Sequence, residues 1–580
     1  MSLLLIAVIA AVFLFTAYRA YGSLLARLFR LNPDVSTPAV TLRDDVDYQP
    51  LQPTFLLSQH FSAIAAAGPI VGPILAGAMF GWLPALLWIL LGAVFIGGVH
   101  DLGALTASIR HRARSIAEVV REHMSRRSYV LFLTFVWFAL LYIIVAFTDI
   151  TATSFLGAVT LENGEKVSGG GIATSSFLYL LLPVVMGLLL RFTKLTVGAA
   201  TLLFLPLVGL AIWVGQYIPF DLSTALGWSE WTAHKAWNVA LLAYCLLASL
   251  VPVWLLLQPR GHLGGWFLFL TLVGGTLGLI FSGEKAEYPA FIGWTAAKGE
   301  PLLPMLFITI ACGACSGFHA IIASGTTSKQ LRRETDAKLI GYGAMLLEGM
   351  VAVVSLSCVM RLTTTSPLIT GGVRPNFLYA DGIGGFLSVL GIPPSFAVSF
   401  ALMAFTTFVY DTLDVCTRLG RYVIEELTGW RTRVGRTFAA VLTAGVPVPF
   451  LMQRSTDAAG NPIPVWKTFW ELFGASNQLL AALTLIGVTV WLWRTRRAAW
   501  VFLVTGVPTV FMYVMSMWAL LRIIRVDAGL HGLGGSVISW VSMILVALAG
   551  LMGIEAVKAF LSPGTPPSMR AEIAVATELI

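Results

Sequence analysis

Charged side chains are scarce in this chain. Asp, Glu, Lys and Arg make up 11% of its 580 residues, whereas about 25% is usual for a soluble globular domain. Hydrophobic residues reach 57%, and the mean hydropathy is +0.84. This balance excludes an ordinary soluble protein and indicates a polytopic membrane protein. The net charge of +8 would otherwise suggest nucleic acid as a partner, but the placement of the charges argues for membrane topology instead.

Cysteine is also rare. The five cysteines, Cys245, Cys312, Cys315, Cys358 and Cys416, all fall within apolar segments, so we expect no extracellular disulfide framework. Cys312 and Cys315 have the spacing of half a zinc site, but a structural zinc site needs four ligands and the other cysteines are dispersed. We expect no resident metal and no cofactor. The small residues around these cysteines are better interpreted as allowing close helix packing.

Motifs of pumps and common enzymes are missing. The sequence has no G-x-x-x-x-G-K-[ST] phosphate loop, no H-E-x-x-H pair and no G-x-S-x-G elbow, which argues against a primary pump and against the enzymes that carry those motifs. We expect a protein that is not an enzyme. An intramembrane metal-dependent protein, with Glu348, His319 and Asp411 gathered around a metal, is kept as an alternative.

Long apolar runs, in contrast, are abundant. With roughly 20 apolar residues needed per crossing, the sequence predicts about fifteen membrane spans. They lie near 2–22, 55–80, 84–109, 129–149, 174–191, 195–216, 236–257, 264–282, 302–326, 339–360, 393–417, 434–452, 468–493, 499–521 and 534–558.

The basic residues predict the orientation of these spans. If the N-terminus is outside, most of the 37 Lys and Arg fall on the cytoplasmic side, in clusters such as RHRARSIAEVVREHMSRR and SKQLRRETDAK. This asymmetry is the positive-inside pattern, and it places the C-terminus inside. The first apolar run lacks a basic region before it, so we expect a retained helix and not a cleaved signal.

Two of the apolar runs are interrupted by small residues at their middle. Segment 301–326 contains the patch CGACSG, and segment 55–81 contains AAAGPIVGP. Such breaks leave backbone groups that lipid cannot satisfy, so they persist where they line a protein-buried or watery cavity. Paired broken helices are typical of secondary transporters, in which they hold the substrate and the coupling ion.

The two broken segments run in opposite directions across the membrane, which favours inverted repeats. We therefore predict an all-α polytopic membrane protein with a five-plus-five inverted-repeat core and extra helices. The expected divisions are 1–54 for an N-terminal helix and cytoplasmic loop, 55–218 for the first repeat, 219–300 for an inserted helix pair, 301–493 for the second repeat and 494–580 for the C-terminal helices.

Several segments resemble the carbon starvation protein A family. They are QHFSAIAAAGPIVGPILAG, a following VHD, FITIACGACSGFHAIIASGTTSKQL, IGYGAMLLEG, TTFVYDTLDVCTRLGRYVIEEL and LFGASNQLLAALTL, in this order. The resemblance covers most of residues 55–490. It implies a bacterial inner-membrane importer of peptides or of pyruvate, with a LeuT-like fold related to the sodium-coupled amino-acid carriers.

The breaks supply the expected substrate site. No expected span carries a Lys or Arg at its centre, so exposed half-helix N-termini would have to hold a substrate carboxylate. His319 is either a substrate or proton group or a packing histidine, and Asn477 lines the cavity or bridges helices. The expected substrate contacts are Gly68, Pro69, Gly72, Gly313, Ser316, Gly317, His319 and Asn477.

Ionisable residues within spans are costly and mark pathways by default. Glu348 is the deepest carboxylate, and Asp411 and Asp414 share one helical face. Alternatively, the two aspartates pair with Arg418 or Arg421, and Glu348 is a neutral packing residue. Asp101 is expected to support a broken helix. The expected coupling residues are Glu348, Asp411, Asp414 and Thr412.

Together these features predict a secondary active transporter in the bacterial cytoplasmic membrane. Its expected partners are a small-molecule substrate, peptide or pyruvate, a coupling ion and membrane lipids, with no nucleic acid. Protons are favoured because buried carboxylates and a histidine can carry them. A sodium-coupled symporter, with Thr407 and Thr412 hydroxyls as ligands, is the alternative.

Overall fold

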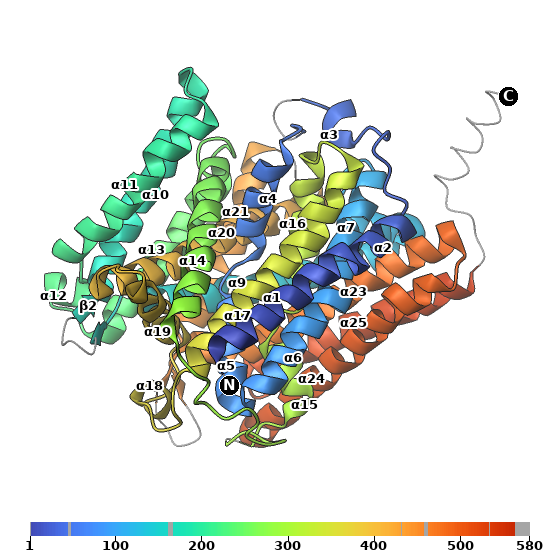
Figure 1. Cartoon of the computed structure of the whole chain (residues 1–580). Helices are drawn as coiled ribbons and strands as arrows, with labels where there is room; N and C mark the ends of the chain where they lie inside the picture. Colours follow the sequence, from blue (N-terminus) through green and yellow to red (C-terminus); the bar gives the residue numbers. More distant parts are fainter. Residues whose placement is uncertain are drawn as a thin grey trace.

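The chain folds as a bundle of long helices (Figure 1). The computed structural model describes residues 2–44, 48–160, 166–297, 299–430, 432–456, 462–532 and 534–562. Two pairs of very short antiparallel strands, β1 (Ala158–Thr160) with β2 (Lys166–Ser168) and β3 (Ser455–Thr456) with β4 (Pro462–Ile463), lie in loops. The expected all-α class is confirmed.

The first half contains α1 (Leu3–Arg19), α2 (Tyr21–Leu28), α3 (Pro38–Thr41), α4 (Pro53–Ile64), α5 (Gly68–Phe80), α6 (Trp82–Gly92), η1 (Ala93–Gly97), α7 (Gly98–Arg110), α8 (Ile116–His123), α9 (Arg126–Ser154), α10 (Gly169–Phe192), α11 (Val197–Tyr217), α12 (Leu222–Leu226), α13 (Glu230–Leu250) and α14 (Leu257–Ser282). The second half contains α15 (Leu302–Thr309), α16 (Gly317–Gly325), η2 (Thr327–Lys329), η3 (Glu334–Asp336), η4 (Lys338–Gly343), α17 (Ala344–Met360), α18 (Pro367–Thr370), α19 (Pro375–Val389), α20 (Pro394–Thr428), α21 (Arg433–Gly445), α22 (Pro447–Met452), α23 (Val465–Arg496), η5 (Phe502–Gly506), α24 (Val507–His531) and α25 (Val537–Leu561).

Within the described ranges, twelve helices are long and apolar enough to cross a membrane, and the bent pair α4 and α5 makes thirteen. Helix α13 and the pair α15 and α16 fall outside this set, although expected spans cover both. The multi-pass architecture is therefore confirmed, while the total of fifteen stays a prediction. Helix α14 begins at Leu257 and not near 264, and α19 lies in the stretch 361–392 where no helix was expected.

The loops that the charge pattern places in the cytoplasm gather at one end of the bundle. Arg110, at the end of α7, has its Nε 2.7 Å from Glu334 Oε1 in the loop after α16. At the opposite end, Trp82 Nε1 donates to the carbonyl of Tyr288 at 3.0 Å. Loops of the same expected side thus meet each other, so the fold agrees with the expected topology.

Cysteine labelling tests this topology directly. Arg121, Arg332 and Lys166 are exposed, and the five native cysteines are all buried. Lys166 is next to position 165, an expected external position that lies outside the described residues. In intact cells, a membrane-impermeant maleimide should label Lys166→Cys, and should label Arg121→Cys and Arg332→Cys only after permeabilisation. Labelling of Arg121→Cys in intact cells would mean that the orientation is inverted.

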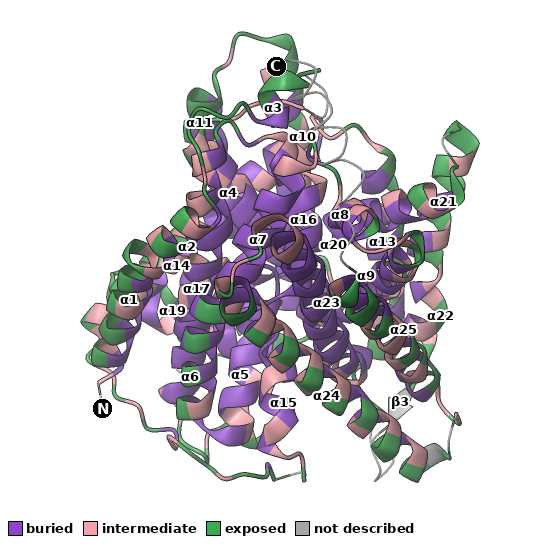
Figure 2. Cartoon of the chain, turned by 90° about the vertical axis from the view of Figure 1, so that its right-hand side faces the viewer, coloured by how far each residue is buried: buried purple, intermediate pink, exposed green. Residues whose placement is uncertain are grey.

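The most buried helices form the centre of the bundle. Every residue in the most apolar window of α23 is buried, and 89% in that of α20, compared with 33% for α1 and for α25 (Figure 2). An apolar helix that the protein buries on one side only must contact another apolar medium, such as lipid, on its other side. The peripheral helices therefore form the outer, lipid-facing layer.

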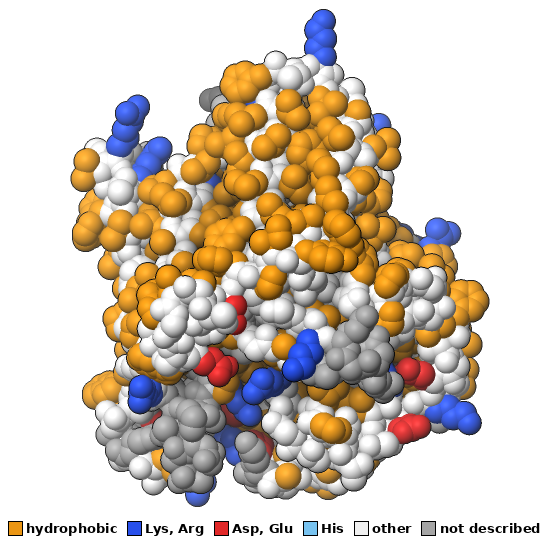
Figure 3. Space-filling view, turned by 90° about the vertical axis from the view of Figure 1, so that its left-hand side faces the viewer, with side chains coloured by type: hydrophobic (Ala, Val, Ile, Leu, Met, Phe, Trp, Pro, Cys, Tyr) orange, Lys and Arg blue, Asp and Glu red, His pale blue; other side chains and the backbone are white. Residues whose placement is uncertain are grey.

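Apolar side chains cover the outer face of α10 and α11. Leu181, Leu202 and Trp213 are 62%, 81% and 52% exposed, and Figure 3 shows hydrophobic side chains over much of this side, with Lys and Arg at its top and charged groups again in its lower part. A continuous apolar surface of this kind is unfavourable in water. It fits the hydrocarbon layer, with lipids as the surrounding partner.

The contacts made by the first broken helix are matched by equivalent contacts of the second, as inverted repeats require. Helix α5 packs against α17, and α16 packs against α7; likewise α4 packs against α14, and α15 against α23. The arrangement agrees with the expected LeuT-like five-plus-five core. Helices α10 and α11 form a hairpin at the edge of the bundle (Figure 1), whereas α14 also packs against α20.

Candidate functional site

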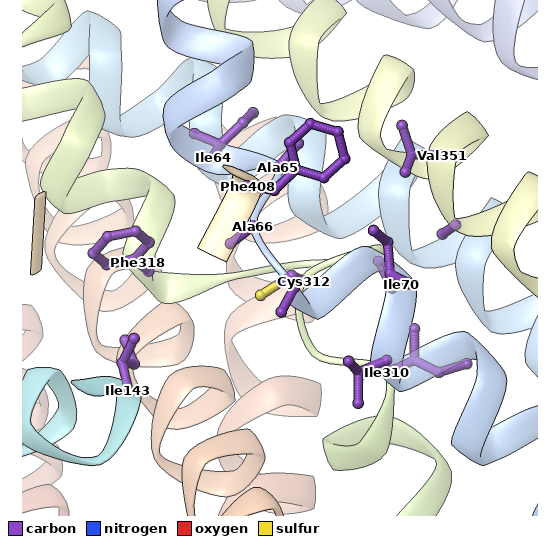
Figure 4. Close-up of a cluster of buried hydrophobic side chains, with 14 of the residues drawn as sticks. Ile64, Ala65, Ala66, Ile70, Ile143, Ile310, Cys312, Phe318, Val351 and Phe408 are labelled. Atoms are coloured by element: carbon purple, nitrogen blue, oxygen red, sulfur yellow. The ribbon is translucent and has the colours of Figure 1, made fainter. Parts of the chain in front are cut away.

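The two helix breaks contact each other at the centre of the bundle. Helices α4 and α5 are bent by 48° at their break, and the second break separates α15 from α16. A Cβ on Gly68 would overlap the side chain of Cys312, and one on Gly313 would approach Ala352 and the backbone of Pro69. Figure 4 shows the two connecting segments side by side. The small residues are therefore needed for this close approach.

The remaining predicted backbone contacts also lie here. A Cβ on Gly72 would overlap the carbonyl of Thr309, and one on Gly317 would overlap backbone atoms of Asn477 and Ala481 on α23. The structure thus brings together the glycines of both breaks, as the sequence predicted. The space between these segments is filled by apolar side chains such as Ile70 and Phe318 (Figure 4).

Asn477 on α23 caps the first turn of α16. Its Oδ1 accepts from the backbone N–H of Phe318 at 3.0 Å and from the hydroxyl of Ser316 at 3.3 Å, and its Nδ2 donates to the same hydroxyl at 3.0 Å. The N-terminal end of α16 was expected to hold a substrate carboxylate. In this conformation the Asn477 side chain takes that place and caps α16, with the Ser316 hydroxyl bonded to Asn477.

The neighbouring residue, Gln478, satisfies the other end of the same break. Its Nε2 lies 3.0 Å from the carbonyl oxygen of Phe307, 3.3 Å from that of Ile310 and 3.2 Å from that of Ala311. These carbonyls belong to the last turn of α15 and the start of the break, where the helix leaves acceptors unpaired. One pair of amide side chains on α23 therefore stabilises both ends of the second break.

A chain of four buried ionisable side chains runs beside the second break. His319 Nδ1 on α16 lies 2.8 Å from Asp101 Oδ2 on α7, and His319 Nε2 lies 3.1 Å from Glu348 Oε2 on α17. Asp101 Oδ1 is 2.7 Å from His100 Nδ1. All four side chains are 0% exposed. The expected role of Asp101 as support for a broken helix agrees with this contact.

Glu348, the deepest expected carboxylate, lies against a histidine in the structure. His319 faces it at ion-pair distance, although neither Glu348 oxygen has a hydrogen-bond partner among the described residues. A buried carboxylate against a histidine can share or pass a proton between two groups of adjustable basicity. Burial makes such a group costly unless it is partnered or functional. Glu348 and His319 are therefore the best-supported pair for proton movement.

The aspartates of α20 have a partner that sequence analysis missed. Arg260 on α14 is 0% exposed; its Nε lies 3.1 Å from Asp411 Oδ1, and its Nη1 contacts Asp414 Oδ2. The alternative partners Arg418 and Arg421 do not make these contacts. Arg260 was overlooked because it lies just before the expected start of its span.

Thr412 does not join either cluster. Its hydroxyl donates to the carbonyl of Phe408, one turn earlier on its own helix, at 3.2 Å. Its expected role as a coupling residue is therefore not supported by its position. The metal-dependent alternative fails for a related reason, because Asp411 is paired with Arg260 whereas Glu348 and His319 belong to the other cluster.

Two further polar groups were also missed. Near the outer end, Asp149 accepts from Asn238 Nδ2 at 3.1 Å and from the backbone N–H of Trp466 at 2.9 Å, which caps α23. Its position at the very end of an expected span concealed it. At the cytoplasmic end, His111 Nε2 and His123 Nε2 lie 2.8 Å apart, with Glu122 beside them.

The histidine pair at the cytoplasmic end has the spacing of a metal site. Among the described residues, His111, Glu122 and His123 form the group whose ligand atoms lie close enough together. Burial is the main cause that lowers the pKa of His123 to about 3, so His123 is neutral at physiological pH. Neutral histidines also form N–H···N hydrogen bonds, and the pair joins the end of α7 to α8 in this way.

Comparison with known proteins identifies relatives over nearly the whole chain. A family model described as carbon starvation protein CstA matches residues 2–368 and 368–519. The pyruvate/proton symporter BtsT of Escherichia coli K12 is 30% identical, with 89% of this chain and 81% of BtsT covered. The peptide transporter CstA of Bacillus subtilis is 31% identical, with 87% of each covered, and that of Campylobacter jejuni is 31% identical, with 88% and 79% covered.

Solved structures show a more distant likeness. MhsT in complex with L-phenylalanine has a TM-score of 0.48 and 12% identity, and the match covers 89% of this chain and 99% of MhsT. Mhp1, a nucleobase-cation-symport-1 family transporter, has a TM-score of 0.41 and 13% identity, with 91% and 96% covered.

Proposed function

This chain belongs to the carbon starvation protein CstA family, whose members are multi-pass inner-membrane transporters, and on that premise we propose that it imports a small carboxylate with protons. The observation that carries the proposal is the buried chain from Glu348 through His319 and Asp101 to His100. It lies directly beside a helix break, where a secondary transporter changes its access.

Proton coupling follows from the chemistry of these four residues. Each neighbouring pair lies within 3.1 Å, so a proton needs only short steps to move along the chain. The histidine between two carboxylates supplies two ring nitrogens, each of which can accept or donate a proton. Sodium would instead need several oxygen ligands, and in this chain the Thr412 hydroxyl is bonded to its own helix.

We place pyruvate ahead of peptides as the substrate. The N-terminal end of α5 would suit a carboxylate in a conformation that opens the apolar space beside it, because the helix dipole is positive there. A peptide would also need a carboxylate for its ammonium group. Asp411 is paired with Arg260, and Glu348 lies against His319, so neither is an isolated negative charge. BtsT, named as a pyruvate/proton symporter, agrees with this choice.

We further propose a different division of the first repeat. Helix α14 packs against α4 and α20 in the way that α23 packs against α15 and α9, and α13 packs against α9 as α21 packs against α20. These relations make α13 and α14 the fourth and fifth spans of the first repeat. The hairpin of α10 and α11, with its apolar outer face toward lipid, is then the inserted pair, in place of the expected 219–300.

Uptake into proteoliposomes tests the function. With a proton gradient of about one pH unit and no sodium, labelled pyruvate should accumulate up to about tenfold, because one pH unit corresponds to a factor of ten in concentration. A protonophore should abolish accumulation, and protein-free liposomes are the control. Excess pyruvamide, which lacks the carboxylate, should not compete. Uptake of dialanine without pyruvate would assign the peptide function, and a strict sodium requirement would contradict proton coupling.

A further inference from the structure

We propose that the guanidinium of Arg260 fills a cation-binding site between α4 and α20, so that the chain carries its own cation among oxygen ligands that would also suit a free one. The proposal concerns the Arg260 cluster, which is separate from the Glu348 chain. It rests on the proposed function only where transport is used as a readout. Its consequence is that the protein does not respond to sodium as long as Arg260 is present.

Oxygen atoms from three helices surround the guanidinium. Asp411 and Asp414 come from α20, and both contact Arg260. Ser62, on α4 just before the first break, donates from its hydroxyl to Asp411 Oδ2 at 2.5 Å, and Tyr244 on α13 donates to Asp414 Oδ2 at 2.8 Å. Carboxylates and hydroxyls are the ligands that hard metal cations prefer, so these oxygens would suit a small cation equally well.

The cluster carries more negative than positive charge. Two carboxylates face one guanidinium, and all three groups are buried, with Arg260 0%, Asp411 4% and Asp414 2% exposed. The nearby Arg418 does not balance the excess by contact, because its Nη2 donates to the carbonyls of Ala248 and Val251 at 2.6 and 2.8 Å. Removing Arg260 would therefore leave two uncompensated carboxylates in a buried place, which is strongly unfavourable.

The polar atoms of the cluster are not fully used. Arg260 Nη2, Asp414 Oδ1 and Thr407 Oγ1 are buried and have no hydrogen-bond partner among the described residues. Thr407 lies four residues before Asp411 on α20 and so shares its face. A site whose only task was a structural ion pair would be expected to satisfy these groups. The spare oxygens are those that a cation in place of the guanidinium would recruit.

Close packing keeps the oxygens in place. A Cβ on Gly264, one turn after Arg260, would overlap Asp411 Oδ2 and the hydroxyl of Ser62. Glycine therefore lets α14 lie directly on the contact between α4 and α20. Because α14 supplies both the guanidinium and this glycine, the position of the cation is fixed by the helix and not by a flexible loop.

The test compares the response to sodium of purified Arg260→Gln with that of the unchanged protein. We expect the melting temperature of the variant to rise by about 3 °C or more in NaCl relative to choline chloride, because an ion that binds only the folded state stabilises it. The unchanged protein and Arg260→Lys should show no such difference. The matched control is Arg418→Gln, which removes a neighbouring buried arginine that donates to the backbone carbonyls of Ala248 and Val251; it should not gain a sodium response.

Uptake provides the second readout. Sodium should stimulate Arg260→Gln by about fivefold or more, a usual size for coupling between two sites, and should leave the unchanged protein unaffected. If Arg260→Gln does not fold, the double variant Arg260→Gln with Asp414→Asn keeps the original net charge of the cluster and is used in its place. A folded variant with no preference for sodium overturns the proposal, even if proton-driven uptake is observed. Sodium-specific stabilisation of the unchanged protein overturns it as well.

Discussion

Glu348→Gln is expected to abolish accumulation of substrate while leaving exchange intact. Glutamine has nearly the same shape but cannot release or accept a proton at neutral pH. The variant therefore keeps the contact with His319 but cannot exchange a proton with it. Under a proton gradient of about one pH unit, accumulation should fall from up to about tenfold to about one, the value for uncoupled equilibration. Proteoliposomes loaded with unlabelled substrate measure exchange separately.

The control for this variant is Glu230→Gln. Glu230 is an exposed acid at the start of α13, so the same substitution there should change neither accumulation nor exchange. His319→Gln should act like Glu348→Gln, because it interrupts the same chain between Glu348 and Asp101. If Glu348→Gln accumulates substrate normally, Glu348 is a packing residue and the proton must use another route.

Gly68→Leu and Gly317→Leu are expected to abolish uptake with the protein still inserted in the membrane. At Gly68 even a Cβ overlaps Cys312, and at Gly317 it overlaps backbone atoms of α23. Overpacking of this kind costs about 1–3 kcal/mol when the surroundings can shift, and here it forces the two breaks apart. Uptake in proteoliposomes measures the loss, and size-exclusion chromatography confirms the fold.

A rescue experiment separates the two glycines. Gly68→Ala should lose most uptake, and the double variant Gly68→Ala with Cys312→Gly should recover it, because the overlapping atoms are those of the Cys312 side chain. Gly317→Ala has no such remedy, since its neighbours include the backbone N–H of Ala481 and the carbonyl of Asn477. Normal uptake by Gly68→Leu and Gly317→Leu would remove the breaks from the transport path.

Features that are local in the sequence were predictable. Glycine and proline within an apolar run mark a break wherever they occur, so both broken helices and their residues, Gly68 and Gly317 among them, follow from composition and position. Buried ionisable residues are costly in any membrane protein, which singled out Glu348, His319 and Asp101. The expected all-α multi-pass fold follows from the lengths of the apolar runs.

Features that depend on distant partners were not predictable. Arg260 and Asp411 are about 150 residues apart in the sequence. Hydropathy alone places Arg260 outside the expected span. The cap formed by Asn477 on α16 depends on how α23 packs, which no local pattern records. For the same reason, the sequence offered only Arg418 and Arg421 as arginine partners of Asp411, whereas its partner in the structure is Arg260.

The double cap on α23 has a mechanical consequence for the two breaks. Asn477 is hydrogen-bonded to the start of α16 and Gln478 to the end of α15. Both halves of the second broken helix are therefore bonded to the same helix, α23. The halves of the first broken helix have different main supports: α5 packs mainly against α17, whereas α4 packs mainly against α14, with smaller contacts to α17 and α20. A rocking motion that opens the cytoplasmic side would therefore hinge at residues 65–67. In such a motion α4 would move together with α14, whereas α15, α16 and α23 would move as one body.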